Sequence, residues 1–147
     1  ELTAVNQYLA QSMMCKRWGY HKLAQHHYAD YQEERTHAEL VIDRILFLEG
    51  KPIINVGEHI DLGNNVKEQV EKDLKLEMKV VQFYNDMIAA CTKHKDAGTR
   101  EVAEFLLKSS EDDVLDLEEQ LHLIKQIGLD NYLIEQIGDK NSGKKHD

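Results

Sequence analysis

The sequence predicts an all-α protein, a four-helix bundle with a short fifth helix near its C-terminal end. Three observations lead to this prediction. Apolar residues recur at three- and four-residue steps through four long segments, which is the spacing of an amphipathic helix. A single Pro and 8 Gly would leave an all-β chain without the turns it needs. The 147 residues are enough for one domain with a sizeable core.

Five helical segments can be placed by their periodicity and by the signals at their ends. They are predicted at residues 1–18, 22–49, 65–93, 99–127 and 130–137. Gly19, Gly50 and Gly128 follow three of them, and glycine is common just after a helix end. Asn65 and Thr99 are the predicted N-caps of the third and fourth segments, because their side chains can accept a hydrogen bond from a free backbone N–H.

The connection between the second and third helices decides the topology. Residues 51–64 form a linker that contains Pro52, Gly57 and Gly63. Fully extended, the linker reaches about 45 Å, whereas the second helix is about 40 Å long. The linker can therefore return along the whole bundle, which makes the second and third helices parallel. The other connections between long helices are short and predict antiparallel neighbours. We expect one domain over residues 1–137 and a polar, disordered tail over residues 138–147.

Charge and cysteine content exclude several classes of function. Lys and Arg number 18 and Asp and Glu number 27, which gives a net charge of −9. A chain this acidic is a poor candidate for binding nucleic acid or an anionic membrane. No stretch approaches the roughly 18 to 20 apolar residues of a membrane span. Cys15 and Cys91 have no CxxC spacing, and we expect them to be buried thiols in a reducing cytoplasm.

Ionisable side chains interrupt the apolar stripes of the helices. Glu34, His37 and Glu77 stand where a Leu or Val would continue the stripe. Counting along parallel second and third helices places Glu34 and Glu77 at one level, and antiparallel packing brings Asp113 there too. Glu1 fits this level less well, by a few residues. A carboxylate in a bundle core must be paired, protonated or bound to a metal, and carboxylates with imidazole suit iron or manganese.

The Glu-x-x-His spacing on the second helix is weak support for a metal site by itself, since such a pair also arises by chance. The chain has another pair, Glu119-His122. This pair is rotated by about 180° from the core face, at 100° per residue, and is expected to face solvent. His26 and His27 are interpreted as packing or surface groups rather than as ligands.

Several stretches of the sequence are distinctive. They are ELTAVNQY at 1–8, RWG at 17–19, RILFLEGKP at 44–52, DLKLE at 73–77 and IGLDNYLIEQI at 127–137. Together they resemble bacterioferritin over the whole chain except its tail. The resemblance implies a ferritin-like four-helix bundle with one long crossover, assembled into a hollow cage of 24 subunits that oxidises Fe(II) and stores Fe(III) mineral. The family has a further helical stretch upstream of the position of Glu1, so we expect residues to be missing there.

The resemblance also implies a di-iron centre of non-haem iron. Glu1 and His37 match the ligands of one iron. Glu34 matches a bridging carboxylate, and Glu77 matches a ligand of the second iron. These four residues are the candidate catalytic residues of a ferroxidase. Tyr8 matches a tyrosine that the family has beside this centre, although a buried tyrosine with a bonded hydroxyl would look the same.

Two positions on the fourth helix depart from the family. Where the family has a second Glu-x-x-His, Ser110 stands in place of the bridging Glu and Asp113 in place of the His. One bridge is therefore lost, although Asp113 can still offer an oxygen to a metal. Glu111 is next to the lost position but rotated about 100° from the core. We expect the first iron site to persist and the second to be weakened.

A further departure concerns haem b. The family binds it between two subunits through a Met directly after the first bridging Glu, and Arg35 stands there. Guanidinium stays protonated and has no free lone pair, so it cannot be an axial ligand. A cage of this chain alone is expected to lack haem, which would be present only if a partner subunit supplied its ligand.

The residues and the resemblance leave more than one function open. The first is an iron-storage subunit with its own, impaired ferroxidase centre that uses oxygen or peroxide. The second is a structural subunit of a mixed cage that relies on a second bacterioferritin subunit for ferroxidase activity and haem. A helical bundle without a metal role would be recognised by a melting temperature that Fe(II) leaves unchanged. The resemblance also implies a cytoplasmic protein and a ferredoxin-type reductant for iron release.

Overall fold

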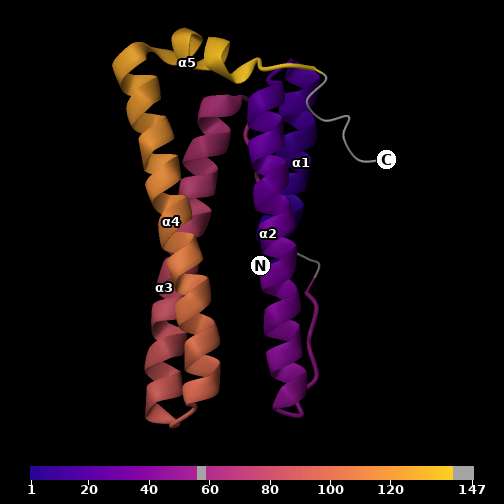
Figure 1. The fold of residues 1–147 in the computed structure, drawn as a ribbon, viewed down its shortest axis with the longest axis vertical. Coiled ribbons are helices and arrows are strands. Elements are labelled where there is room, and N and C mark those ends of the chain that lie inside the picture. The colour runs from indigo at the N-terminus through magenta and orange to yellow at the C-terminus, as the bar shows by residue number, and fades with distance from the viewer. Residues whose placement is uncertain (56–58, 141–147) are drawn as a thin grey trace.

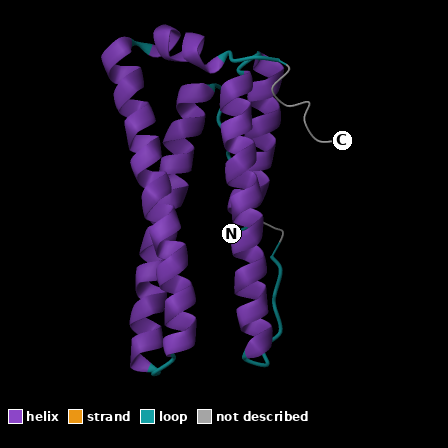
Figure 2. Cartoon of the chain, viewed as in Figure 1, coloured by secondary structure: helices purple, strands orange, loops and turns teal. Residues whose placement is uncertain are grey.

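The computed structural model of the chain describes residues 1–55 and 59–140. In these residues every regular element is a helix, and there is no strand. The helices are α1 (Leu2–Trp18), α2 (His21–Phe47), α3 (Val66–Lys93), α4 (Ala97–Ile127) and α5 (Leu129–Gln136). Figure 2 shows four long helices and one short helix joined by loops. The predicted all-α fold with a short fifth helix is confirmed.

The long helices are arranged as two antiparallel pairs (Figure 1). α1 packs along α2, and α3 packs along α4. α2 and α3 run in the same direction, because the described parts of their connection lead back along the bundle. α5 lies across the end of the bundle at which α4 finishes. The predicted arrangement with one long crossover is therefore present.

The helix ends follow from the local sequence. Gly19 ends α1 with a φ of 91°, a left-handed conformation that glycine adopts without strain. Asn65 is the N-cap of α3, as predicted, and its side chain accepts a 3.0 Å hydrogen bond from the backbone N–H of Glu68. Gly63, just before this cap, has a φ of 76°, and a Cβ there would lie 2.8 Å from the backbone nitrogen of Gln69. Glycine is therefore the residue that fits the turn into α3.

α4 begins earlier than the sequence predicts. The expected N-cap was Thr99, whereas the structure has Asp96 in that role. The Asp96 carboxylate accepts a 3.0 Å hydrogen bond from the Thr99 backbone N–H and lies 3.1 Å from the Arg44 guanidinium. Because one carboxylate both caps the helix and pairs with a cation, Asp96 is a better cap than Thr99. The same contact ties the end of α2 to the start of α4.

The core consists of two apolar clusters with buried polar side chains between them. The cluster toward α5 is formed by Cys15, Leu23, Ala24, Val66, Val70, Leu117, Ile124 and Tyr132. The cluster toward the α3–α4 turn is formed around Tyr84, Ala103 and Leu106. The polar layer between them includes Gln7, His27, Glu34, His37, Asp73, Glu77 and Ser110. Burying a polar group costs free energy unless it is hydrogen-bonded or bound to a ligand. The polar layer is therefore the candidate functional region of the bundle.

Three other expectations concern membrane segments, thiols and the chain end. No helix in the described part of the chain combines the length and the apolar character that crossing a membrane requires. Cys15 and Cys91 are buried, free thiols, as expected. The prediction of a polar, disordered tail covers residues 138–147, and residues 141–147 of it lie outside the described residues. The domain boundary at residue 137 stays a prediction.

Candidate metal centre

The polar layer brings together the five side chains that the sequence predicts as metal ligands. Their ligand atoms form two groups, and within each group the atoms lie within 4.8 Å of one another. The first group is Glu1, Glu34 and His37. The second group is Glu34, Glu77 and Asp113. Glu34 belongs to both groups. A carboxylate that bridges two metal ions would have to lie in this way between them.

The first group is formed by α2 and the residue before α1. Glu34 and His37 are buried one turn apart on α2, and Glu34 Oε1 lies 3.2 Å from His37 Nδ1. Glu1 Oε2 lies 3.7 Å from the same nitrogen. The Tyr84 hydroxyl donates a hydrogen bond to the other oxygen of Glu1. Counting residues placed Glu1 a few residues away from the level of Glu34 along the bundle. A glutamate side chain spans most of a helical turn and can reach across that distance.

The second group joins α3 and α4 to α2. Glu77 is 1% exposed and accepts a 2.7 Å hydrogen bond from the Tyr8 hydroxyl of α1. Asp113 is half-buried on α4, and Ser110 is buried one turn before it. Ser110 offers a neutral hydroxyl rather than a carboxylate or an imidazole. α4 therefore supplies one carboxylate to the cluster, and no imidazole.

The cluster holds several carboxylates in a small buried volume, which changes their ionisation. Burial raises the pKa of Glu1 to about 8, with the neighbouring Glu34 adding to the effect. Burial also raises the pKa of Glu77 to about 8 and that of Asp113 to about 7. Although burial opposes both shifts, the hydrogen bond between Glu34 and His37 lowers the pKa of Glu34 and raises that of His37. The cluster thus holds protons near neutral pH that a bound cation would displace.

A buried network beside the cluster is absent from the sequence predictions. Asp73 on α3 is fully buried, and its Oδ1 accepts hydrogen bonds from Gln7 at 2.6 Å and from Gln11 at 2.7 Å. Burial raises the pKa of Asp73 to about 7. The network fixes α1 against α3 and so positions Tyr8, which binds Glu77. The sequence could have indicated this network, because Gln7 and Gln11 lie one turn apart on the same face of α1 and can bind one acceptor together.

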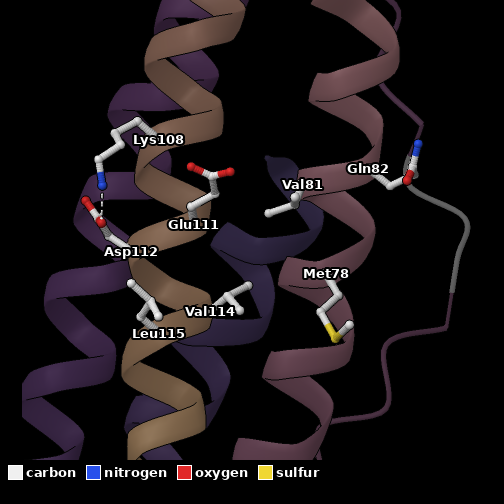
Figure 3. Close-up of a pocket in the computed structure, with 8 residues that line it drawn as sticks. All are labelled: Met78, Val81, Gln82, Lys108, Glu111, Asp112, Val114 and Leu115. Carbon is white, nitrogen blue, oxygen red and sulfur yellow. Dashed lines mark hydrogen bonds and ion pairs between the residues drawn. The ribbon is translucent and has the colours of Figure 1, made fainter.

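A surface groove lies away from the cluster, between α3 and α4. It has a volume of about 550 Å³ and is lined by Met78, Val81, Gln82, Lys108, Glu111, Asp112, Val114 and Leu115 (Figure 3). Lys108 pairs with Asp112 at its edge. None of these lining residues is an imidazole or a buried carboxylate, so the groove is not a candidate metal site. Glu111 points into this groove rather than the core, and Glu119 and His122 are exposed, as the helical register predicts.

Arg35 stands where the resemblance to bacterioferritin implies a haem ligand, and its side chain does not fit that role. Its side chain is 54% exposed on α2, and a guanidinium nitrogen lies 3.9 Å from Glu39 Oε1. The guanidinium also lies 5.9 Å from the centre of the Tyr31 ring. A guanidinium has five N–H donors and no free lone pair to offer a haem iron. The residues at this position therefore do not support haem ligation.

Comparison with known proteins identifies the family of the chain. A profile of the ferritin-like domain, named Ferritin, matches residues 1–127. The chain is 41% identical over 138 residues to a bacterial ferritin of Pseudomonas aeruginosa, covering 93% of this chain and 89% of that protein. It is 38% identical over 138 residues to a bacterial ferritin of Synechocystis, covering 93% and 88%. It is 35% identical over 132 residues to a bacterioferritin of Mycobacterium avium, covering 90% and 83%.

Proposed function

The chain belongs to the ferritin-like domain family, and on that premise we propose that it stores iron as a subunit of a bacterioferritin-like cage of 24 subunits, with a partly degenerate di-iron ferroxidase centre of its own. The observation that carries the proposal is that the Glu34 carboxylate belongs to both groups of ligand atoms. Glu1 and His37 complete one iron position, and Glu77 and Asp113 complete the other. Fe(II) is the substrate, and Fe(III) mineral inside the cage is the stored product.

The side chains of the centre contribute geometry and negative charge. Each Fe(II) gives one electron to oxygen or peroxide, and carboxylate ligands favour the more highly charged Fe(III) product. Glu1, Glu77 and Asp113 release their protons as the cations enter, so the net charge of the buried site changes little. Tyr8 holds the Glu77 carboxylate in place through its 2.7 Å hydrogen bond.

Ser110 is the reason to expect an impaired centre. A serine hydroxyl is neutral and short, so α4 offers no second bridging carboxylate at this level. Asp113 offers an oxygen where the family has an imidazole, and its side chain is shorter. The iron position formed by Glu77 and Asp113 therefore binds more weakly than the position formed by Glu1 and His37.

Oxidation of Fe(II) in air by the purified, assembled protein tests the proposal. Iron added in small increments is expected to be oxidised in a fast phase that saturates at no more than two irons per subunit, one for each group of ligands. Glu34→Ala should remove this phase, whereas Glu119→Ala, at an exposed position on α4, should leave it intact. Slow oxidation that does not saturate and that Glu34→Ala leaves unchanged would overturn the proposal.

Ser110 and Arg35 together favour a second candidate function. Each departure removes a ligand of the family and supplies no equivalent, as expected for a structural subunit whose partner in a mixed cage supplies ferroxidase activity and haem. Mass spectrometry of native cages from the source cells tests this candidate. A second bacterioferritin subunit in the same cages supports it, and cages of this chain alone contradict it.

The proposal extends to the cellular setting. We place the protein in the cytoplasm, because a reducing compartment suits two free, buried thiols. Fe(III) mineral must be reduced before iron can leave the cage, and we assign that step to a ferredoxin-type reductant. Release of Fe(II) from loaded cages on addition of a reduced ferredoxin, compared with the oxidised protein, tests this assignment.

A further inference from the structure

A small cavity lies between α2 and α4, next to the candidate metal centre on the side toward α5. Its volume is about 120 Å³. Two histidines and several aspartates line it, among them His26, His27 and Asp30 from α2 and Asp113 and Asp116 from α4. None of its lining residues is Lys or Arg. The cavity therefore gathers carboxylates and imidazoles, and its cationic side chain is His26, whose pKa the hydrogen bond to Asp116 raises to about 9.

His27 is the most deeply buried histidine of this cavity. Its side chain is 2% exposed, and neither ring nitrogen has a hydrogen-bond partner among the residues that the structure describes. Burial lowers the pKa of His27 to about 3, so the imidazole is neutral and keeps a free lone pair. A buried polar group without a partner costs free energy and calls for an explanation. Neutral imidazole is the commonest protein ligand of transition metals, so a cation is a partner that fits.

Three further ionisable groups line the cavity beside His27. Asp30 Oδ2 lies 4.0 Å from His27 Nδ1 and 3.8 Å from His26 Nε2. His26 Nε2 lies 3.1 Å from Asp116 Oδ2. Ligand atoms bonded to one zinc-sized cation at about 2.1 Å lie about 3 to 3.5 Å from each other. The two distances to Asp30 Oδ2 lie just above that range, so a cation bound here would draw these side chains closer together.

We propose that this cavity is a second cation site, which binds one divalent first-row transition metal through His27, Asp30 and Asp116. An imidazole with two carboxylates is a ligand set for Zn²⁺, Co²⁺ or Fe²⁺. The site shares no ligand with the two groups of the candidate centre, so it can be occupied on its own. His26, hydrogen-bonded to Asp116, is the group that a metal must displace from that carboxylate.

Binding of Co²⁺ to a protein with a disabled centre tests this inference. The assembled variant Glu34→Gln/Glu77→Gln is dialysed against Co²⁺, and bound metal is measured by elemental analysis and by visible absorption, which reports nitrogen and oxygen coordination. One Co²⁺ per subunit is expected to remain. Adding His27→Leu or Asp116→Asn should weaken its binding at least about tenfold. Adding His122→Leu, at an exposed position on α4, is the matched control and should change nothing.

The two ligand variants guard against a folding artefact. Asp116 has a side chain that is 47% exposed, so its variant is expected to fold even if His27→Leu does not, and far-UV circular dichroism checks both. Absence of bound Co²⁺ in the Glu34→Gln/Glu77→Gln background would overturn the inference. Binding that survives both ligand variants would overturn it as well. Neither result bears on the ferroxidase proposal, because that centre is already disabled in this background.

Discussion

Glu34 Oε1 lies 3.2 Å from His37 Nδ1, one turn away on the same face of α2. The Glu34 carboxylate also belongs to the group that includes Glu77 and Asp113 from α3 and α4. A single side chain therefore joins the two candidate iron positions. Each position also has ligands of its own, so variants at shared and unshared residues should differ in how many ions they lose.

Glu34→Gln should lower the number of bound Zn²⁺ ions by two per subunit, whereas Asp113→Asn should lower it by one. The reason is that Glu34 contributes to both groups and Asp113 to one. Equilibrium dialysis with elemental analysis measures both losses relative to the unmodified protein. Zn²⁺ bound at other sites is the same in each protein and does not affect the difference. Glu39→Gln, at an exposed position on α2, is the control. Equal losses in the first two variants would contradict the bridging role of Glu34.

Ser110→Glu with Asp113→His should accelerate Fe(II) oxidation by about tenfold or more. The double variant supplies the second bridging carboxylate and the imidazole that α4 lacks. Ser110 is 5% exposed, so the new side chain must enter the polar layer, and the melting temperature checks that the fold accepts it. Ser109→Glu adds the same charge at the neighbouring position, rotated by about 100°, and should not accelerate oxidation. An unchanged rate in a double variant that melts normally would count against the role assigned to Ser110.

The level of the candidate metal centre along the bundle could be predicted from the sequence because helices rise by a fixed distance per residue. Once the long linker made α2 and α3 parallel, counting placed Glu34, Glu77 and Asp113 together. The N-cap of α4 could not be predicted in this way. It depends on Arg44, which is far from Asp96 in sequence and adds an ion pair that Thr99 cannot make.

His27 shows a second limit of sequence reasoning. A helical wheel assigns this residue to a face of α2, but burial alone does not tell whether a ring nitrogen has a partner. That depends on the side-chain positions of Asp30 and of residues on α4, which only the packed structure provides. The sequence therefore predicted His27 as a packing or surface group, whereas the structure shows a buried imidazole that has no hydrogen-bond partner in the described part of the chain.

Arg35→Met should allow the assembled protein to take up haem, to a limit of one haem for each pair of subunits. A thioether sulfur has a lone pair for the haem iron, whereas the guanidinium has none. Titration with haem, followed by visible absorption, measures the uptake. Arg35→Leu removes the same charge without adding a ligand and should remain without haem. Uptake by neither variant would show that residues other than Arg35 also exclude haem.

The stability of the metal-free protein should fall as the pH rises from about 5 to 8. Glu77 has a pKa of about 8 in the folded protein, against an ordinary value of 4.5. The pKa of Glu1 is also raised from 4.5 to about 8. In this window the folded state holds protons that the unfolded chain has released. The stabilisation is fully present below the unfolded pKa and is lost as the pH rises through the folded pKa. Each such proton contributes a slope of about 1.4 kcal/mol per pH unit.

Glu77→Gln should make this slope shallower by up to about 1.4 kcal/mol per pH unit, because one of the retained protons is gone. Denaturant titrations with a chelator at constant subunit concentration measure the free energy of unfolding across the window. His26 and His27 also have shifted pKa values, so the difference between variants is the quantity to compare. Glu119→Gln, exposed on α4, should leave the slope unchanged. If Glu77→Gln leaves it unchanged too, Glu77 is already ionised in the folded protein, and metal binding near neutral pH would displace no proton from it.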